Sequence, residues 1–356
     1  MKLNCNIIVT QYKGNDLEMR LTQDIGIDLG TTTVLVYIKE KGIVLHEPSI
    51  VAVNKYTGDV VAVGKKAKAM LGRTPEGIIA IKPLKDGVIS DYIITEKMLR
   101  YFLEKVSEKR IINPRLMICV PSGVTEVEKR AVINVANNMG ARKVHIIEEP
   151  LAAAIGAGID IAKPRGNMVI DIGGGTTDIA VISLGGIVKK KSVKVAGNKF
   201  DEAITKYIKK KYGIVIGDRT SEKIKMEIGC VSKKPNIENV YVNGRNFSTG
   251  MPEEIITNTA DMYEALKPLA QEIVDAVIAT IEELPPELAS DISTNGIYLT
   301  GGGSLIYGLD KLIQEKTGIE VRHAENPEQC VVYGTGKALD YAEILEAGEG
   351  LKIKKI

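Results

Sequence analysis

Short apolar runs alternate along the chain with longer stretches in which apolar residues recur every three or four positions. The short runs, which are rich in β-branched residues, predict strands at 25–28, 34–38, 116–120, 144–147, 168–171, 179–183 and 297–300. The longer stretches predict helices at 96–110, 201–211 and 260–283. Strands interleaved with helices in this way indicate an α/β fold.

Several helix boundaries are marked by their end residues. Thr125 and Glu128 have the spacing of a capping box, so a helix is expected from there to about Met139, followed by Gly140. Pro150 suits the first turn of another helix, because its missing N–H has no partner to lose there. Ser304 is expected to open a helix after a glycine triplet.

Residues 1–23 follow neither pattern and are interpreted as an N-terminal extension of unknown role. Polar residues interrupt every apolar run near the start of the chain, which argues against a signal peptide. No apolar run approaches the roughly 18 residues of a membrane span.

One segment occurs twice. Residues 28–33 and 171–176 share the frame Asp-apolar-Gly-x-x-Thr, and apolar runs flank both copies. The copies are about one domain length apart, which predicts two homologous halves that present the same turn to a common cleft. A third turn with three glycines follows at 301–303.

Glycine-rich turns let backbone amides approach a phosphate, because no Cβ is in the way. The chain has 35 glycines in 356 residues, a modest excess over the average of about 7%. Strand-like runs follow the first two turns, and neither a Gly-Lys-Ser/Thr sequence nor a helix-opening G-x-G-x-x-G is present. Two β-hairpins that hold phosphates from opposite sides are therefore expected, and the Asp before each turn suits Mg²⁺ bound through water.

Composition narrows the class of protein further. The net charge of +2 gives no electrostatic footprint for nucleic acid, and the balanced mix of residues excludes a disordered or collagen-like chain. Four widely spaced cysteines without a CxxC pair are interpreted as reduced thiols. Three histidines show no metal-ligand spacing, so a structural zinc site is not expected.

The hairpins resemble the two phosphate motifs of the actin/Hsp70/sugar-kinase superfamily, and residues 299–304 resemble its adenosine motif. Within the superfamily, the chain resembles the MreB/Mbl family of bacterial actins over about residues 24–345. The matching stretches are DIGIDLGT (24–31), EPSIVAV (47–53), VGKKAKAMLGRTP (63–75), KPLKDGVISDY (82–92), VPSGVTEVEKRAV (120–132), IIEEPLAAAIGAG (146–158), GNMVIDIGGGTTDIAVISLG (166–185), STGMP (248–252) and PPELASDI (285–292).

The resemblance implies an actin-like ATPase fold with two lobes, each a ribonuclease-H-like core with a smaller inserted subdomain, and a nucleotide cleft between them. Lobe I is expected at 24–165 with its insertion at about 50–92, and lobe II at 166–329 with its insertion at about 201–262. Residues 330–356 are expected to form a helix that returns to lobe I, and a tail.

The resemblance also implies the cofactors, ATP and Mg²⁺, and the residues that bind them. Asp28 and Asp171 correspond to Mg²⁺ ligands acting through water. Glu149 corresponds to the residue that positions or deprotonates the attacking water, and Thr176 is a second candidate catalytic residue. Glu222 and Lys225, three apart on an expected helix, share a face that corresponds to the adenosine site. The expected nucleotide contacts are Gly30, Thr31, Thr32, Thr33, Gly173, Gly174, Gly175, Thr176, Glu222, Lys225, Thr300, Gly301, Gly302 and Gly303.

One pair of residues departs from the family pattern. Thr32 and Thr33 stand where most relatives have Ala-Asn after Gly-Thr. A threonine hydroxyl still donates a hydrogen bond to phosphate, but it reaches less far than an asparagine amide. We therefore expect Thr32 and Thr33 to alter the nucleotide affinity or the hydrolysis rate.

For function, the resemblance implies a weak ATPase coupled to assembly into paired antiparallel filaments on the inner face of the cell membrane. The expected partners are other copies of the chain, the membrane and transmembrane cell-wall elongation proteins, in a cytoplasmic, peripheral location that guides cell-wall synthesis and maintains rod shape. Ile111 and Ile112 correspond to a membrane-contacting loop, although a loop that packs them inward remains an alternative. A soluble small-molecule kinase and an Hsp70-like ATPase remain alternative functions.

Overall fold

The structure is a computed structural model that describes residues 23–106 and 114–342. The predicted extension at 1–23, apart from Gln23, and the predicted membrane contacts Ile111 and Ile112 lie outside these residues. Within the described part of the chain, no helix combines the length and the apolar character needed to cross a membrane.

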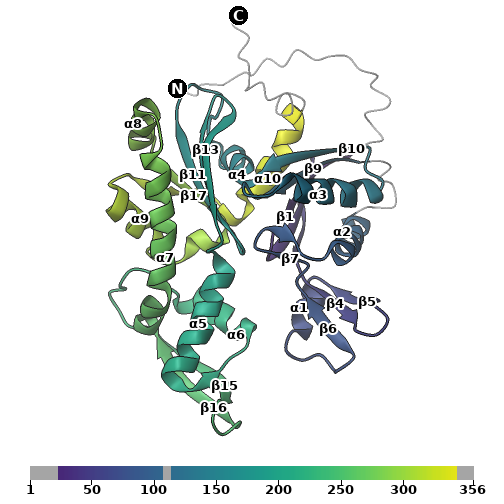
Figure 1. The fold of residues 1–356 in the computed structure, drawn as a ribbon, viewed down its shortest axis with the longest axis vertical. Coiled ribbons are helices and arrows are strands. Elements are labelled where there is room, and N and C mark those ends of the chain that lie inside the picture. The colour runs from purple at the N-terminus through teal and green to yellow at the C-terminus, as the bar shows by residue number, and fades with distance from the viewer. Residues whose placement is uncertain (1–22, 107–113, 343–356) are drawn as a thin grey trace, which may run out of the picture.

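Two five-stranded sheets share one strand order (Figure 1). The first runs β10-β9-β1-β2-β3 and is built from β1 (Asp24–Leu29), β2 (Thr33–Ile38), β3 (Gly42–Pro48), β9 (Arg115–Val120) and β10 (Lys143–Glu148). The second, read in the matching direction, runs β18-β17-β11-β12-β13. It is built from β11 (Asn167–Ile172), β12 (Thr177–Ser183), β13 (Gly186–Val193), β17 (Ile297–Thr300) and β18 (Val321–His323). The repeat predicted from the two turns therefore extends to whole sheets.

The register of the two sheets matches at the turns. β1 pairs antiparallel with β2 and parallel with β9, and Asp28 lies opposite Cys119. β11 pairs antiparallel with β12 and parallel with β17, and Asp171 lies opposite Thr300. Each acidic residue thus stands at the carboxyl end of its strand, beside a small polar side chain from the parallel neighbour.

Two helices, α4 (Glu149–Gly156) and α10 (Cys330–Ala338), pack against each other between the sheets. Glycine allows this close contact. A Cβ on Gly156 would lie 1.8 Å from the carbonyl oxygen of Cys330, and one on Gly334 would lie 1.7 Å from that of Ala152. α10 also contacts β1 and β2, so the end of the described chain returns to the first sheet.

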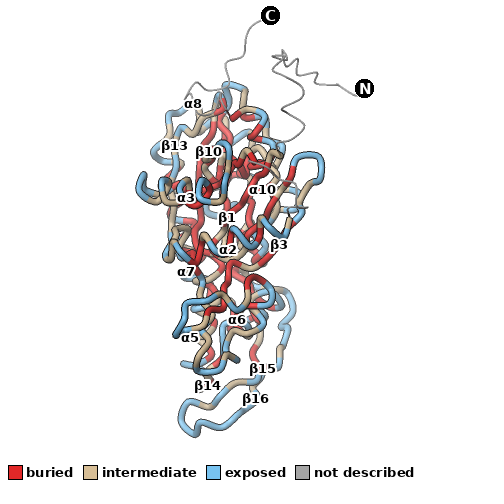
Figure 2. Tube along the Cα trace, turned by 90° about the vertical axis from the view of Figure 1, so that its right-hand side faces the viewer, coloured by how far each residue is buried: buried red, intermediate tan, exposed pale blue. Residues whose placement is uncertain are grey.

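The remaining helices cover the outer faces of the sheets. α2 (Tyr92–Val106) and α3 (Glu126–Asn138) join the apolar core of the first sheet, and α7 (Thr259–Glu282), α8 (Pro286–Asn295) and α9 (Leu309–Thr317) join that of the second. Figure 2 shows buried segments running through the centre of the molecule, whereas the β15–β16 end is exposed.

Each half carries a small sheet at the lower end of the molecule in Figure 1. In the first half, β4 (Val51–Asn54), β5 (Val60–Val63) and β6 (Ile78–Ile81) lie beside α1 (Lys65–Met70). In the second, β14 (Ile214–Val215), β15 (Asn239–Asn246) and β16 (Pro252–Asn258) lie beside α5 (Gly197–Tyr212) and α6 (Asp218–Ile228). A short hairpin of β7 (Leu84–Lys85) and β8 (Val88–Ile89) precedes α2.

The predicted strands and the capping box at Thr125 are confirmed. The prediction that Ser304 opens a helix is wrong. Gly302–Leu305 forms a single 3₁₀ turn, in which the Ser304 hydroxyl donates to the Gly301 carbonyl at 2.7 Å. α9 begins only at Leu309, after Gly308 in a left-handed conformation. The short side chain of Ser304 therefore closes the glycine turn on itself and does not cap α9.

Candidate functional site

The two glycine hairpins meet across the gap between the sheets. A Cβ on Gly174 would lie 1.8 Å from the Thr32 hydroxyl oxygen, and one on Gly175 would lie 2.5 Å from that of Thr31. The second turn therefore requires glycine because the threonines of the first turn press against it. The Thr32 hydroxyl also donates to Asn198 Oδ1 at 3.3 Å, which links the first hairpin to α5.

Each turn is held by residues outside the hairpin. Ser49 donates from its hydroxyl to the Gly30 carbonyl at 2.6 Å. The backbone amides of Gly197 and Asn198, at the start of α5, donate to the carbonyls of Gly173 and Gly174 at 3.1 and 2.8 Å. The turns are thus pre-formed, and their glycines leave the backbone accessible to a phosphate.

A cavity of about 460 Å³ lies between the hairpins. This is within the usual size range of small-molecule sites. Most of the predicted site residues line it: Asp28, Gly30, Thr31, Thr32, Thr33, Glu149, Asp171, Gly173, Gly174, Gly175, Thr176, Glu222, Lys225, Gly301, Gly302 and Gly303. Thr300 does not; it is fully buried and donates from its hydroxyl to Asp171 Oδ1 at 2.7 Å.

Three buried carboxylates, those of Asp28, Glu149 and Asp171, line this cavity, and buried Asp178 is close enough to Glu149 for its charge to act on it. Burial raises the pKa of Asp28 to about 6 and that of Asp171 to about 7. Burial, followed by the charges of Asp178 and Asp171, raises the pKa of Glu149 well above its usual value. Burial also raises the pKa of Asp178, although the Ser122 amide, which donates to it at 2.9 Å, acts in the opposite direction.

This arrangement fits a divalent cation. Mg²⁺ takes oxygen ligands, and one or two carboxylates usually hold it together with waters and substrate phosphates. Asp28 and Asp171 supply such carboxylates from equivalent points of the two sheets and line one cavity. A cation between them would offset the burial that makes their ionised forms costly.

The predicted pair on α6 is present, but each member has another partner. Lys225 Nζ lies 2.8 Å from Asp201 Oδ1 and donates to the Gly197 carbonyl at 2.9 Å, which ties α6 to α5. Glu222 lies on the same helix and forms an ion pair with Lys68 of α1, in the other half of the molecule, at 2.8 Å. Both residues line the cavity, and Glu222 also links α6 to the other half of the molecule.

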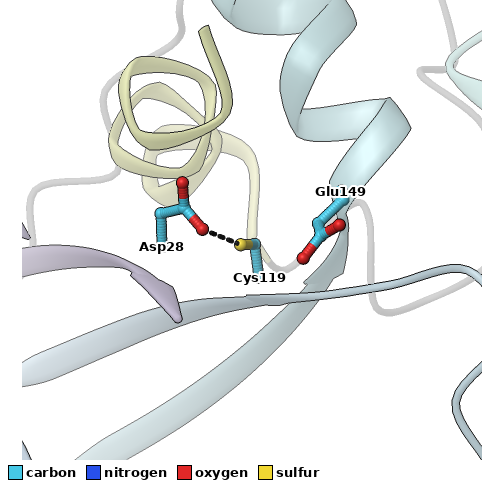
Figure 3. A group of neighbouring side chains, drawn as sticks. All are labelled: Asp28, Cys119 and Glu149. Atoms are coloured by element: carbon cyan, nitrogen blue, oxygen red, sulfur yellow. Dashed lines mark hydrogen bonds between the residues drawn. The ribbon is translucent and has the colours of Figure 1, made fainter. Parts of the chain in front are cut away.

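Sequence reasoning missed several residues at this site. Asn198 and Asp201 line the cavity because α5 starts directly behind the second turn. Asp178 comes directly after Thr176 and Thr177, so its place beside the second turn could have identified it as a residue near the site. Cys119 was interpreted only as a reduced thiol. Its Sγ in fact donates to Asp28 Oδ1 at 3.3 Å (Figure 3).

Comparison with known proteins gives one consistent result. The profile of the MreB/Mbl protein family matches residues 22–347. The cell shape-determining protein Mbl of Bacillus cereus is 50% identical over 319 residues, which are 89% of this chain and 96% of that protein. The cell shape-determining protein MreB of Escherichia coli K12 is 49% identical over 329 residues, 91% of this chain and 95% of that protein.

A solved structure is similar in three dimensions. The crystal structure of MreB5 of Spiroplasma citri bound to AMPPNP superimposes with a TM-score of 0.87 at 40% sequence identity. The match covers 92% of this chain and 99% of that one. The predicted actin-like fold with two lobes is therefore confirmed.

Proposed function

The chain belongs to the MreB/Mbl family of actin-like cell shape-determining proteins, and on this basis we propose that it binds and slowly hydrolyses ATP and assembles into membrane-associated filaments. The observation that carries the proposal is the pair of Asp–Gly hairpins that face each other across one cavity of nucleotide size. The relative from S. citri was crystallised with AMPPNP, an ATP analogue, which supports the choice of ligand.

In this proposal the phosphates lie between the hairpins. Glycine amides of both turns and the hydroxyls of Thr31, Thr32 and Thr33 donate to phosphate oxygens. Asp28 and Asp171 hold Mg²⁺ through water, and the bound Mg²⁺ neutralises charge on the phosphates. The third turn, Gly301–Gly303, and the α6 residues Glu222 and Lys225 contact the adenosine. Thr300 positions Asp171 through its hydrogen bond.

Glu149 is the proposed base for hydrolysis. It is the first residue of α4, is 8% exposed and lines the cavity beside Asp28. Its raised pKa makes the ionised carboxylate a better proton acceptor, because basicity rises with pKa. Glu149 orients the attacking water and accepts its proton at a carboxylate oxygen, while Thr176 lines the same part of the cavity and helps to position that water.

Assembly is proposed to use the exposed end of the second half. Tyr241, Met251 and Ile256 belong to or adjoin the β15–β16 hairpin and are 67%, 66% and 48% exposed. Large apolar side chains grouped at one end of a molecule favour contact with another protein surface. We take another copy of the chain as that partner, in paired antiparallel filaments.

Membrane contact through Ile111 and Ile112, on the inner face of the cell membrane, is part of the same proposal. Transmembrane cell-wall elongation proteins are the proposed further partners, and guidance of cell-wall synthesis, which maintains rod shape, is the proposed output. These points rest on family membership alone, since both isoleucines lie outside the described residues.

Sedimentation with and without ATP-Mg²⁺ tests the proposal. We expect the protein to pellet as filaments with ATP-Mg²⁺ and to remain largely in the supernatant without it. Asp171→Asn, which keeps an acceptor for Thr300 but removes the charge, should pellet less at equal nucleotide. A stable ATP-bound monomer at high concentration contradicts the proposal, and phosphate transfer to a small acceptor without pelleting favours a kinase.

A further inference from the structure

Asp28, Cys119 and Glu149 bring three metal-binding side chains together at the floor of the cavity. Their donor atoms all lie within 4.8 Å of one another, and Cys119 Sγ is 3.3 Å from Asp28 Oδ1. They come from the ends of β1 and β9 and from the start of α4, so three separate elements converge on one point. Figure 3 shows the Asp28 and Glu149 carboxylates on either side of the Cys119 sulfur.

Glu149 supplies an independent reason to expect a ligand here. Its side chain is more than nine-tenths buried. No hydrogen bond or ion pair joins its carboxylate to any residue in 23–106 or 114–342. The carboxylate lines the cavity, so a group bound there, such as a cation or water, is what can satisfy it.

We propose that Asp28, Cys119 and Glu149 form a binding site for a thiophilic divalent cation of the zinc class, distinct from the Mg²⁺ that the carboxylates Asp28 and Asp171 suit.

The donor set selects the metal. Mg²⁺ takes oxygen ligands and keeps several waters, so a sulfur ligand adds little to its binding. Zn²⁺ binds thiolate and carboxylate together, and a soft thiolate favours it over Mg²⁺. Binding displaces the thiol proton of Cys119, so the affinity for Zn²⁺ rises with pH.

The distances are compatible with a zinc ion. Tetrahedral Zn²⁺ holds oxygen and sulfur donors about 3.5 Å apart, from its usual bond lengths. The Asp28–Cys119 pair, at 3.3 Å, is close to this spacing, and the Glu149 donor atom lies within 4.8 Å of both. Asp28 and Glu149 line the cavity, so an ion enters from there and completes its fourth position with water.

A cation at this site would occupy two groups that the proposed ATP hydrolysis uses. Zn²⁺ is therefore expected to arrest hydrolysis. Metal binding itself does not depend on that proposed function, because it rests only on the three side chains.

Cobalt titration of the full chain without nucleotide tests the site. Co²⁺ bound to a thiolate gives a near-ultraviolet charge-transfer absorption, which we expect at one equivalent of metal. Zn²⁺ should abolish the band and a large excess of Mg²⁺ should not. The titration is done with Cys5→Ser, because Cys5 lies outside the described residues and would contribute its own signal.

Cys119→Ser is the decisive variant, and Cys230→Ser is its matched control. Cys119→Ser should abolish the band and lower the affinity for Zn²⁺ by about tenfold or more. Losing a residue that only contacts a metal ligand already costs about tenfold, and losing a ligand should cost at least as much. Cys230 is also buried, but its thiol donates to the Thr259 carbonyl. Its variant should keep the band. A band that survives Cys119→Ser, or that Mg²⁺ displaces, overturns the proposal.

Folding does not obscure the test. A serine at 119 retains a donor for Asp28, as Thr300 does for Asp171 at the equivalent place. If Cys119→Ser nevertheless fails to fold, Glu149→Gln must weaken Zn²⁺ binding by a similar factor, and unchanged affinity there overturns the site. Zinc binding that leaves ATP hydrolysis unaffected would support the site and contradict only the role of Glu149.

Discussion

Lys68 and Glu222 join the two halves of the molecule by an ion pair, with Nζ 2.8 Å from Oε2. Lys68 belongs to α1 and Glu222 to α6, so the contact joins the helices that lie beside the two small sheets, and Glu222 also lines the cavity. Lys82 and Asp218 add a longer contact of 3.8 Å nearby. The pair therefore links α1 of the first half to α6 of the second.

Loss of this pair is expected to speed nucleotide release. Both side chains are about one-third exposed, so the pair contributes at most about 1 kcal/mol. Lys68→Ala should therefore raise the dissociation rate of a fluorescent ATP analogue by up to about fivefold, measured by stopped flow. High salt should bring the unmodified protein closer to the variant, because it screens the pair.

Lys66→Ala is the matched control, since Lys66 is an exposed lysine on the same helix that lines a different cavity. It should leave the dissociation rate unchanged. If Lys66→Ala and Lys68→Ala raise the dissociation rate equally, the positive charge of α1 is responsible and not the contact with Glu222.

Glu149→Gln should lower the rate of ATP hydrolysis by about 10²–10⁴-fold, the usual contribution of a positioned base. Nucleotide binding should be retained, because the hairpins are intact. In the unmodified protein the rate should fall as the pH is lowered through the raised pKa of Glu149, since only the ionised form accepts a proton. Phosphate release measured across pH checks both points, and a variant with the full rate contradicts the role.

The burial and hydrogen bonding of Asp261 predict that the free energy of unfolding depends on pH. It is almost fully buried on α7, and Lys211 and Tyr212 of α5 both donate to it. Burial acts to raise the pKa of Asp261, but these hydrogen bonds and one from Thr257 outweigh it and hold the pKa below 3.8. The ionised carboxylate therefore stabilises the fold above about pH 4, and this contribution is lost as the pH falls through the lowered pKa.

Asp261→Asn should accordingly lower the free energy of unfolding by about 1–3 kcal/mol at pH 7. The difference from the unmodified protein should shrink at acidic pH, where Asp261 is protonated. Denaturant titrations at several pH values measure this. Asp275→Asn changes an exposed residue of the same helix and should cost less than about 0.5 kcal/mol. A pH-independent loss in Asp261→Asn would refute the electrostatic explanation.

The contact between α4 and α10 predicts a large cost for one added methyl group. Gly334→Ala places a Cβ where the Ala152 carbonyl lies, so the helices must move apart. We expect the free energy of unfolding to fall by about 3 kcal/mol, at the upper end for overpacking. Gly217→Ala is the comparison, because Gly217 is exposed and has no atom near its missing Cβ. Similar losses from both would contradict the role of the helix contact, because the lower backbone entropy of alanine in the unfolded chain acts to stabilise the fold.

Local patterns were enough to predict the strands and the α/β class, whereas the two-lobed arrangement was predicted from the family resemblance. The strands of the two hairpins are apolar runs beside glycine turns, and the repeated Asp–Gly frame placed both hairpins at one cleft. The start of α9 could not be predicted, because Ser304 has the residue type of a helix cap but uses its hydroxyl to close the preceding turn. That choice depends on the left-handed conformation of Gly301, which sequence alone does not reveal.

The main features of the site that the sequence did not predict are contacts between residues far apart along the chain. The hydrogen bond from Thr300 to Asp171 follows from the pairing of their strands and has no local signal in the sequence. Helix spacing placed Glu222 and Lys225 on one face, and both line the cavity, but it did not reveal their partners Lys68 and Asp201 on other elements. Cys119 looked unremarkable because its significance comes only from Asp28 and Glu149, which are distant along the chain.

The matching registers of the two large sheets also carry a record of ancestry. If one ancestral half was duplicated, Asp28 with Cys119 and Asp171 with Thr300 descend from a single pair of positions. The two copies kept the acid and diverged at its neighbour, one to a thiol and the other to a hydroxyl. A hydroxyl beside a carboxylate suits only hard cations, whereas a thiol also admits soft ones. The proposed soft-metal site therefore belongs to one copy alone, where Glu149 completes the donor set beside Asp28 and Cys119.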